Sequence, residues 1–448
     1  MRITSRLATA IAVLAFAVPM FKPVHARDGF GIASVRPPDP DSPRARERRS
    51  QLIVQFREQA QERDVARVAR EAGAARVKRS AFGNRYLVDL DAGFTMGEAM
   101  RRLGTAPEVE YAEVNGPVHA FFKPNDLAFE VQWNFRMIEA ERTWDIQKGD
   151  PSVVVAVLDT GIAFEDFGPY RKAPDFGGTV FVQGRDIVNE DDHANDDNFH
   201  GTHVASTIAE ATDNTLGATG LAFRCALMPV KVLDENGDGS FFEVAEGIDF
   251  AARNSSVKII NLSLGGDGNS NTVRAAIDRA VAAGITVVAA AGNDGRGTVS
   301  FPAALPNVIA VGAIDGRKQK APYSNFGSAL DIVAPGGDIR RDDTGANGAP
   351  DGRPDGIIQQ TFDPDTAEFE GRFDDFAYFF VVGTSQATPH VAALACLLYQ
   401  QGIRDPSAIR AAIENSAEDL GQPGRDDRFG FGLIRPDVAL SGYGLNQR

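Results

Sequence analysis

The feature that most constrains the fold is an alternation of two sequence patterns between residues 152 and 313. Short runs of apolar and β-branched residues, such as Ser152–Leu158, are typical of strands that are buried on both faces, and segments with helical periodicity lie between them. The expected strands are 152–158, 227–233, 257–264, 285–291 and 308–313, and the expected helices are 200–211, 242–253 and 272–283. This alternation predicts an α/β domain of three layers, in which right-handed crossovers build a parallel sheet covered by helices.

Residues 51–115 have a different pattern, which predicts a small separate α+β domain. The expected elements are a strand at 51–56, a helix at 61–72, strands at 75–80 and 85–90, a helix at 95–103 and a strand at 109–113. Thr95 and Glu98 have the spacing of a capping box at the start of the second helix. The order βαββαβ is that of a ferredoxin-like fold.

The first 26 residues have the pattern of a signal peptide. A basic start that ends at Arg6 is followed by the uncharged segment Leu7–Phe21 and by Val24-His25-Ala26, which suits cleavage after Ala26. The uncharged segment has 15 residues, which is short for a permanent membrane helix, although an uncleaved anchor is the alternative. We therefore expect an exported protein, in the periplasm or outside the cell and without a membrane segment after processing. Residues 27–50, rich in Pro and Arg, are expected to form a flexible leader.

The net charge argues against one class of partner. The chain has 61 acidic and 46 basic residues, a net charge of −15, and the excess of negative charge lies C-terminal to residue 120. An acidic body repels phosphate groups, so we expect no nucleic-acid partner.

The sequence leaves the state of the two cysteines open. Cys225 and Cys396 both lie in apolar segments. An exported protein can join them in a disulfide, but two buried thiols suit the same surroundings.

Three short segments place a reactive side chain where an α/β sheet forms its ligand sites. Asp159 follows the expected strand 152–158, His200 opens an expected helix, and Ser385 precedes an expected helix at 389–399 whose first turn contains Pro389. Each residue alone has an ordinary structural explanation, such as a cap or a turn. Together they provide the hydroxyl nucleophile, the base and the orienting carboxylate of nucleophilic catalysis.

The same segments resemble the signatures of the subtilisin-like serine proteases. The matching motifs are Val-Leu-Asp-Thr-Gly-Ile at 157–162, His-Gly-Thr-His-Val-Ala at 200–205 and Gly-Thr-Ser-Gln-Ala-Thr-Pro-His at 383–390. The resemblance implies that Asp159 orients the base, His200 is the general acid and base, and Ser385 attacks the scissile carbonyl. It covers residues 125–441, which we expect to be the catalytic domain. The small domain at 51–115 is similar to the family's inhibitory propeptide, so residues 116–124 are the expected processing linker.

The resemblance also implies residues that bind the substrate. The strand that ends at Ala291 continues into Gly292-Asn293, and in this family the Asn, here Asn293, helps to stabilise the oxyanion together with the Ser385 amide. Gly292 is expected beside the substrate. Two segments resemble the edges between which an extended peptide lies, and they contain Ser263, Leu264 and Gly265 on one side and Gly237 and Gly239 on the other.

Two oxygen-rich segments are considered as metal sites. Ala211–Gly217 takes the position of the family's calcium loop, with Asp213 and Asn214 as candidate ligands, although its length and residues differ from the family pattern. A second oxygen-rich segment, with Asp191, Asp192, Asp196 and Asp197, is another candidate for a cation site, although such acidic runs are typical of solvated loops. We expect no cofactor in the chemistry and a calcium ion only in a stabilising role.

The sequence therefore predicts a secreted serine endopeptidase that is made as a zymogen and forms an acyl-enzyme. We expect a monomer whose partners are protein and peptide substrates and its own propeptide, acting as an intramolecular inhibitor. An inactive homologue that only binds peptides is one alternative. An esterase is another, but it would require Gly-x-Ser-x-Gly, and the second glycine is replaced by Ala387.

Overall fold

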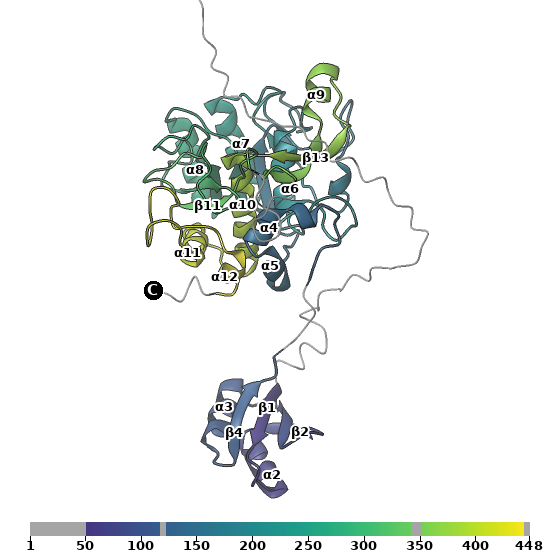
Figure 1. The fold of residues 1–448 in the computed structure, drawn as a ribbon, viewed down its shortest axis with the longest axis vertical. Helices are drawn as coiled ribbons and strands as arrows, with labels where there is room; N and C mark the ends of the chain where they lie inside the picture. Colours follow the sequence, from purple (N-terminus) through teal and green to yellow (C-terminus); the bar gives the residue numbers. More distant parts are fainter. Residues whose placement is uncertain (1–50, 117–121, 342–351, 443–448) are drawn as a thin grey trace, which may run out of the picture. The chain divides into compact units, whose positions relative to one another are not determined.

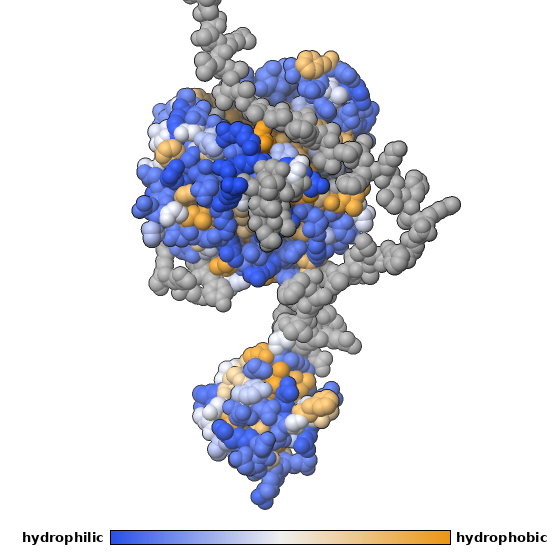
Figure 2. Space-filling model, in the orientation of Figure 1, coloured by the Kyte–Doolittle hydropathy of each residue, from blue (hydrophilic) through white to orange (hydrophobic). Residues whose placement is uncertain are grey.

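The computed structural model describes residues 51–116, 122–341 and 352–442, and these residues divide into two compact units, one before residue 117 and one after residue 121. None of the helices in these ranges is long and apolar enough to cross a membrane. The expected signal peptide and the leader lie outside the described residues. On the face that Figure 2 shows, the described residues of each unit are mostly hydrophilic, with hydrophobic residues scattered among them.

The smaller unit is the predicted ferredoxin-like domain (Figure 1). Its elements are β1 (Gln51–Phe56), α2 (Glu62–Glu71), β2 (Ala74–Arg79), β3 (Arg85–Leu90), α3 (Met96–Thr105) and β4 (Val109–Val114). The strands form an antiparallel sheet in the order β2-β3-β1-β4. The Thr95 hydroxyl caps α3 by accepting a hydrogen bond from the Glu98 amide at 3.3 Å, at the spacing noted in the sequence.

The larger unit contains the predicted parallel sheet. Seven strands lie in the order β11-β10-β9-β8-β5-β7-β6, and every paired neighbour is parallel. Their bounds are β5 (Val154–Asp159), β6 (Arg185–Asp186), β7 (Ala226–Lys231), β8 (Val257–Leu262), β9 (Thr286–Ala290), β10 (Val308–Ile314) and β11 (Ile332–Pro335). The residues of β5, β7 and β9 are all buried, as the continuous apolar runs predict.

Helices cover both faces of this sheet (Figure 1). One face packs against α6 (His200–Ala209) and α10 (Thr384–Gln400), and the other packs against α7 (Phe241–Arg253) and α8 (Asn271–Ala282). This unit also contains α4 (Trp133–Met137), α5 (Ala140–Ile146), α11 (Pro406–Ser416) and α12 (Pro436–Leu440). The three-layer α/β prediction is confirmed.

The long segment before Ser385 contains more regular structure than its composition suggests. β12 (Ile357–Phe362) and β13 (Phe376–Val381) form an antiparallel pair, with α9 (Pro364–Glu370) between them. His203 of α6 contacts this pair, because its Nε2 lies 3.1 Å from the Ile357 carbonyl and 3.2 Å from the Phe379 carbonyl. Burial lowers the pKa of His203 to about 3, so this imidazole is neutral and donates its hydrogen to the hairpin.

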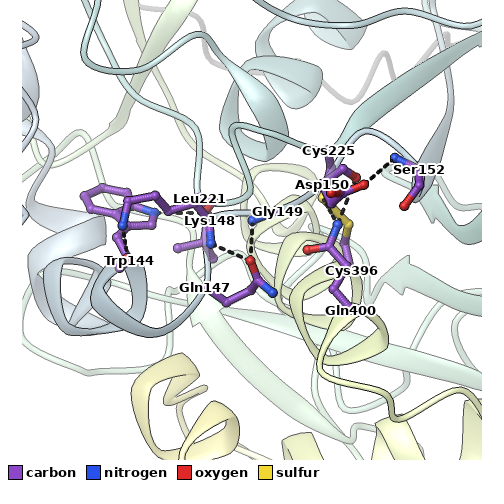
Figure 3. Close-up of a disulfide and its surroundings, with 10 residues drawn as sticks. All are labelled: Trp144, Gln147, Lys148, Gly149, Asp150, Ser152, Leu221, Cys225, Cys396 and Gln400. Carbon is purple, nitrogen blue, oxygen red and sulfur yellow. Dashed lines mark hydrogen bonds between the residues drawn. A yellow bond between two sulfur atoms is a disulfide. The ribbon is translucent and has the colours of Figure 1, made fainter. Parts of the chain in front are cut away.

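The structure resolves the question about the cysteines, because Cys225 and Cys396 form a disulfide (Figure 3). The bond joins the loop before β7 to α10 across 171 residues of sequence, and both residues are buried. Beside it, the Gln400 side-chain amide donates to the Asp150 carbonyl at 2.8 Å. The helix α10 and two loops that are distant from it in sequence are therefore fixed together.

Candidate active site

Asp159 is the last residue of β5, at the carboxyl end of the sheet. Its side chain is fully buried, and Oδ1 accepts hydrogen bonds from the Thr160 amide at 2.8 Å and from His200 Nδ1 at 2.7 Å. Within the described part of the chain, Oδ2 has no hydrogen-bond partner. A buried carboxylate with so few donors depends on the imidazole beside it, which suits the role of orienting a base.

His200 begins α6, and the residue after it explains how the helix comes so close to Asp159. A Cβ on Gly201 would lie 2.1 Å from the Gly161 carbonyl oxygen, so only glycine fits there. Burial by itself lowers the pKa of His200, but the charge and hydrogen bond of Asp159, with the charge of Asp196, raise the pKa above its usual value. The imidazole is therefore a stronger base than a free histidine.

Ser385 lies in the first turn of α10, because the helix begins at Thr384, earlier than the expected start at Pro389. Pro389 has no N–H to donate to the Ser385 carbonyl one turn back. That carbonyl accepts from the Ser263 hydroxyl at 2.8 Å instead. The helix therefore continues through the proline, with a side chain from β8's C-terminal loop in place of the missing backbone donor.

The structure joins two members of the expected triad directly and leaves the third bonded elsewhere. His200 and Asp159 are in contact, whereas the Ser385 hydroxyl donates to the Ser263 carbonyl at 3.0 Å. Among the described residues, no hydrogen bond links Ser385 to His200. The Ser385 hydroxyl would have to leave the Ser263 carbonyl to donate to His200, and such contacts often tighten only when substrate is bound.

Asn293 is held next to Ser385 by Thr384, the residue before that serine. Its Oδ1 accepts from the Thr384 amide and from the Thr384 hydroxyl, both at 2.9 Å. Its Nδ2 has no partner among the residues the structure describes, and Asn293 is exposed. The amide therefore has a fixed oxygen and a free donor, the state that oxyanion stabilisation requires.

The other residues that the sequence predicts to bind the substrate have the following surroundings. Gly292 has a positive φ, and a Cβ there would lie 2.3 Å from both Ser300 Oγ and Asn325 Nδ2. Gly237 also has a positive φ, and a Cβ on Gly239 would lie 2.3 Å from the Val232 carbonyl oxygen. Of the remaining segment, Ser263 bonds Ser385 as described, Leu264 packs against the core, and Gly265 lies against Phe301 and Ser300.

A cavity of about 260 Å³ lies next to this segment. Residues 266–269 line one side, and residues around Ser300 and Phe301 line another. Arg296, which lines the cavity, pairs with Asp294 at 3.1 Å and also with Asp267. Both carboxylates are therefore paired with the same guanidinium group.

The expected calcium loop, residues 211–217, contacts a buried acidic cluster that the sequence did not indicate. Burial raises the pKa of Asp126 to about 7 and also raises the pKa values of Asp175 and Glu210. The expected ligands contact this cluster, since the Asp213 amide donates to Asp126 at 2.8 Å and the Asn214 side chain bonds Asp175 at 2.6 Å. Across the described ranges, no three His, Cys, Asp or Glu residues form a metal-binding group. The oxygen donors that suit a hard cation here are the two carboxylates and an amide.

Lys231, Asp196 and Asp197 also contact the elements that form the site, although the sequence assigned them no role in it. Lys231 is fully buried, and its Nζ donates to Asp197 at 2.6 Å and to the carbonyls of Thr160 and Leu233. Asp196 is also buried and accepts from Thr160 and from the first turn of α6. Interpreting this acidic segment as a solvated loop was therefore wrong for Asp196 and Asp197, because burial is decided by tertiary packing. The only feature of the sequence that links Asp196 to the site is its position four residues before His200.

The geometry can be set beside known proteins. The profile of the Subtilase family matches residues 150–432, and that of the Fervidolysin N-terminal prodomain matches residues 40–115. A "Thermophilic serine proteinase" of Bacillus sp. (strain AK1) is 35% identical over 386 residues, which cover 85% of each chain. The "Thermitase" of Thermoactinomyces vulgaris is 36% identical over 304 residues, covering 68% of this chain and 94% of the relative.

Two more comparisons concern location and fold. An "Extracellular protease" of Xanthomonas campestris pv. campestris is 33% identical over 419 residues, covering 84% of this chain and 67% of the relative. A solved protease structure from Pseudoalteromonas arctica has a TM-score of 0.62 and 28% identity, and the match covers 71% of this chain and 99% of that one. The chain therefore belongs to the subtilase family of serine proteases and has a fervidolysin-like prodomain on the N-terminal side of its catalytic domain.

Proposed function

We propose that the protein is a secreted serine endopeptidase, made as a zymogen, with Asp159, His200 and Ser385 as its catalytic triad. The observation that carries the proposal is the 2.7 Å contact between His200 Nδ1 and the buried Asp159 carboxylate, where α6 packs against α10, whose first turn contains Ser385. A buried His and Asp pair at the end of a parallel strand has the properties of an activated general base.

In the proposed reaction, Ser385 rotates from the Ser263 carbonyl and gives its proton to His200 Nε2 as Oγ attacks the scissile carbonyl carbon. Asp159 keeps Nδ1–H in place and stabilises the imidazolium that forms. His200 then protonates the leaving amine, which yields the acyl-enzyme. Water, deprotonated by His200, hydrolyses the ester and restores the hydroxyl.

The free Asn293 donor is proposed to stabilise the developing oxyanion with the Ser385 backbone N–H. We expect Asn293→Ala to lower kcat by a factor of about 10²–10³, the loss that subtilisin shows when its corresponding donor is removed. KM should change little, because the hydrogen bond forms mainly in the transition state. Steady-state kinetics on a peptide anilide measure both constants. Asn307→Ala removes an exposed amide on the surface and serves as the control, and an Asn293→Ala enzyme with unchanged kcat would contradict the role.

The substrate is proposed to lie extended between the segments 237–239 and 263–265, with one side chain in the cavity of about 260 Å³. The carboxylates of Asp267, which lines this cavity, and of Asp294 both pair with Arg296, and Arg274, which also lines it, donates to the Asn269 side chain. An uncharged side chain therefore fits it better than a basic one, because no unpaired carboxylate is left to attract a cation.

Secretion and maturation form part of the proposal. The disulfide supports an oxidising compartment, where such bonds persist, and the sequence relatives include an extracellular protease. We propose that residues 51–115 inhibit the enzyme until the chain is cut within 116–124, and that the mature enzyme acts as a monomer.

A stabilising calcium ion is also proposed, held by Asp126, Asp175 and Asn214. A cation there would keep these buried carboxyls ionised and has no part in the reaction. We expect chelation to lower the melting temperature, because bound calcium adds about 2.7 kcal/mol when its free concentration is one hundred times the dissociation constant. Calorimetry with calcium or with EDTA measures the difference. The Asp126→Asn, Asp175→Asn variant should lose this difference, and equal melting temperatures for the unaltered protein would refute the site.

The proposed activity is tested with a fluorophosphonate probe and casein on the purified mature protein. Labelling at Ser385 together with casein cleavage is the expected result. A protein that binds peptides but is not labelled would instead be a non-enzymatic binder, and ester turnover without casein cleavage would indicate an esterase.

A further inference from the structure

A second buried carboxylate lies close to the proposed base. Asp196 is 1% exposed and lies four residues before His200. It accepts five hydrogen bonds, on Oδ1 from the Thr160 hydroxyl and the Asn198 and Phe199 amides, and on Oδ2 from the Thr202 amide and hydroxyl. All of these distances lie between 2.6 and 3.1 Å.

These hydrogen bonds form part of a closed path that includes two residues of the proposed triad, Asp159 and His200. Thr160, the neighbour of Asp159, donates its hydroxyl hydrogen to Asp196 at 2.8 Å and accepts from the Gly201 amide at 2.9 Å. Gly201 follows His200 in the first turn of α6. The path therefore runs from Asp159 through Thr160 and Asp196 to the start of α6, and returns through the hydrogen bond between His200 and Asp159.

The start of α6 requires such support. The first amides of a helix have no partner within the helix, and here they belong to buried residues. Phe199, at the N-cap, has a φ of 95°, a left-handed conformation that a residue with a bulky side chain rarely adopts. The hydrogen bond from its amide to Asp196 helps to hold this conformation, and with it the direction from which His200 approaches Asp159.

We infer that Asp196 is a positioning residue of the proposed protease, whose carboxylate fixes the first turn of α6 and so sets the orientation of the His200 imidazole towards Asp159. The inference rests on the proposed function. It does not give Asp196 contact with the substrate, and none of its hydrogen bonds involves the substrate segments 237–239 and 263–265.

The test is the kinetics of Asp196→Asn in the mature enzyme. We expect kcat per labelled active site to fall by about tenfold or more, because small errors in the position of a base are costly. KM should stay within about twofold, since the substrate contacts are unchanged.

The pH profile separates positioning from a general loss of stability. The titratable groups around His200 are Asp159, Asp196, His203, which is neutral, and the ion pair of Asp197 with Lys231. His200 must be neutral to act as a base, so the acid limb of kcat/KM follows its pKa. Removing the negative charge of Asp196 lowers that pKa, so the limb should move to lower pH by about half a unit or more.

Asp192→Asn is the matched control, because it makes the same change on an exposed residue of the same loop that pairs with Arg185 at 2.8 Å. It should leave kcat and the acid limb unchanged. An acid limb that stays in place in Asp196→Asn would overturn the inference, even if less active protein is recovered.

Two more variants decide the question if Asp196→Asn does not fold. Thr160→Ala breaks the path between Asp159 and Asp196, whereas Thr160→Ser keeps the hydroxyl. We expect Thr160→Ala to lower kcat and Thr160→Ser to restore it, and equal kcat values for the two would overturn the inference. If the unaltered enzyme is neither labelled nor active, the proposed function fails instead.

Discussion

Ser385→Ala is expected to lower kcat for peptide hydrolysis by a factor of about 10⁶, the loss that subtilisin, a member of the same family, shows when its nucleophile is removed. Without the hydroxyl there is no acyl-enzyme, and only transition-state binding by the remaining groups can contribute. The same variant should not be labelled by a fluorophosphonate. Active-site titration and cleavage of a peptide anilide measure the two effects.

A double variant makes this test more specific. The hydroxyl and the imidazole act as one unit, so Ser385→Ala, His200→Ala should be no less active than Ser385→Ala alone. Ser255→Ala, on an exposed serine of the same unit, is the control and should behave as the unaltered enzyme. A nucleophile at another position would be indicated if Ser385→Ala retained labelling and activity.

Reduction of the Cys225–Cys396 disulfide is expected to produce the largest loss of stability. The bond closes a loop of 171 residues, and in the chain-entropy account a disulfide that closes more than 100 residues contributes about 4–5 kcal/mol to the free energy of unfolding. The effect arises mainly because the cross-link restricts the unfolded chain.

The measurement compares oxidised and reduced protein of one sequence by denaturant titration. The Ser385→Ala background prevents autolysis during the experiment. Cys225→Ala, Cys396→Ala should match the reduced protein and should not respond to reductant, which separates loss of the cross-link from other effects of reduction. Identical transition midpoints for oxidised and reduced protein would contradict the prediction.

Much of the fold could be predicted because it depends on local patterns. The run that ends at Asp159 is apolar without interruption, and only a strand with both faces covered suits it. The expected positions of Asp159, at the end of a strand, and of His200, at the start of a helix, agree with the structure, because both follow from where the periodicity changes.

The remaining features depend on contacts between distant residues. Pro389 indicates the start of a helix when read alone, but α10 begins at Thr384, and the Ser263 hydroxyl, from another part of the chain, bonds the carbonyl that the proline leaves without a backbone donor. Asp196 lies in a polar, acidic segment whose composition is typical of a solvated loop. Its burial depends on donors from β5's C-terminal end and from α6, which periodicity does not reveal. Asp126 and Asp175 are separated from the calcium loop by many residues and could not be assigned to it from local pattern.

The contacts of His203 indicate where the hairpin of β12 and β13 can accept insertions or deletions. Its imidazole contacts β12 at Ile357 and β13 at Phe379, towards the end of the hairpin where Ile357 pairs with Val381, shortly before the helix that contains Ser385. The turn that contains α9 lies at the opposite end of that hairpin, beyond Phe362 and Phe376. Insertions or deletions at this tip can therefore reshape the outer surface of the enzyme while the strand that delivers Ser385 keeps its anchorage on α6.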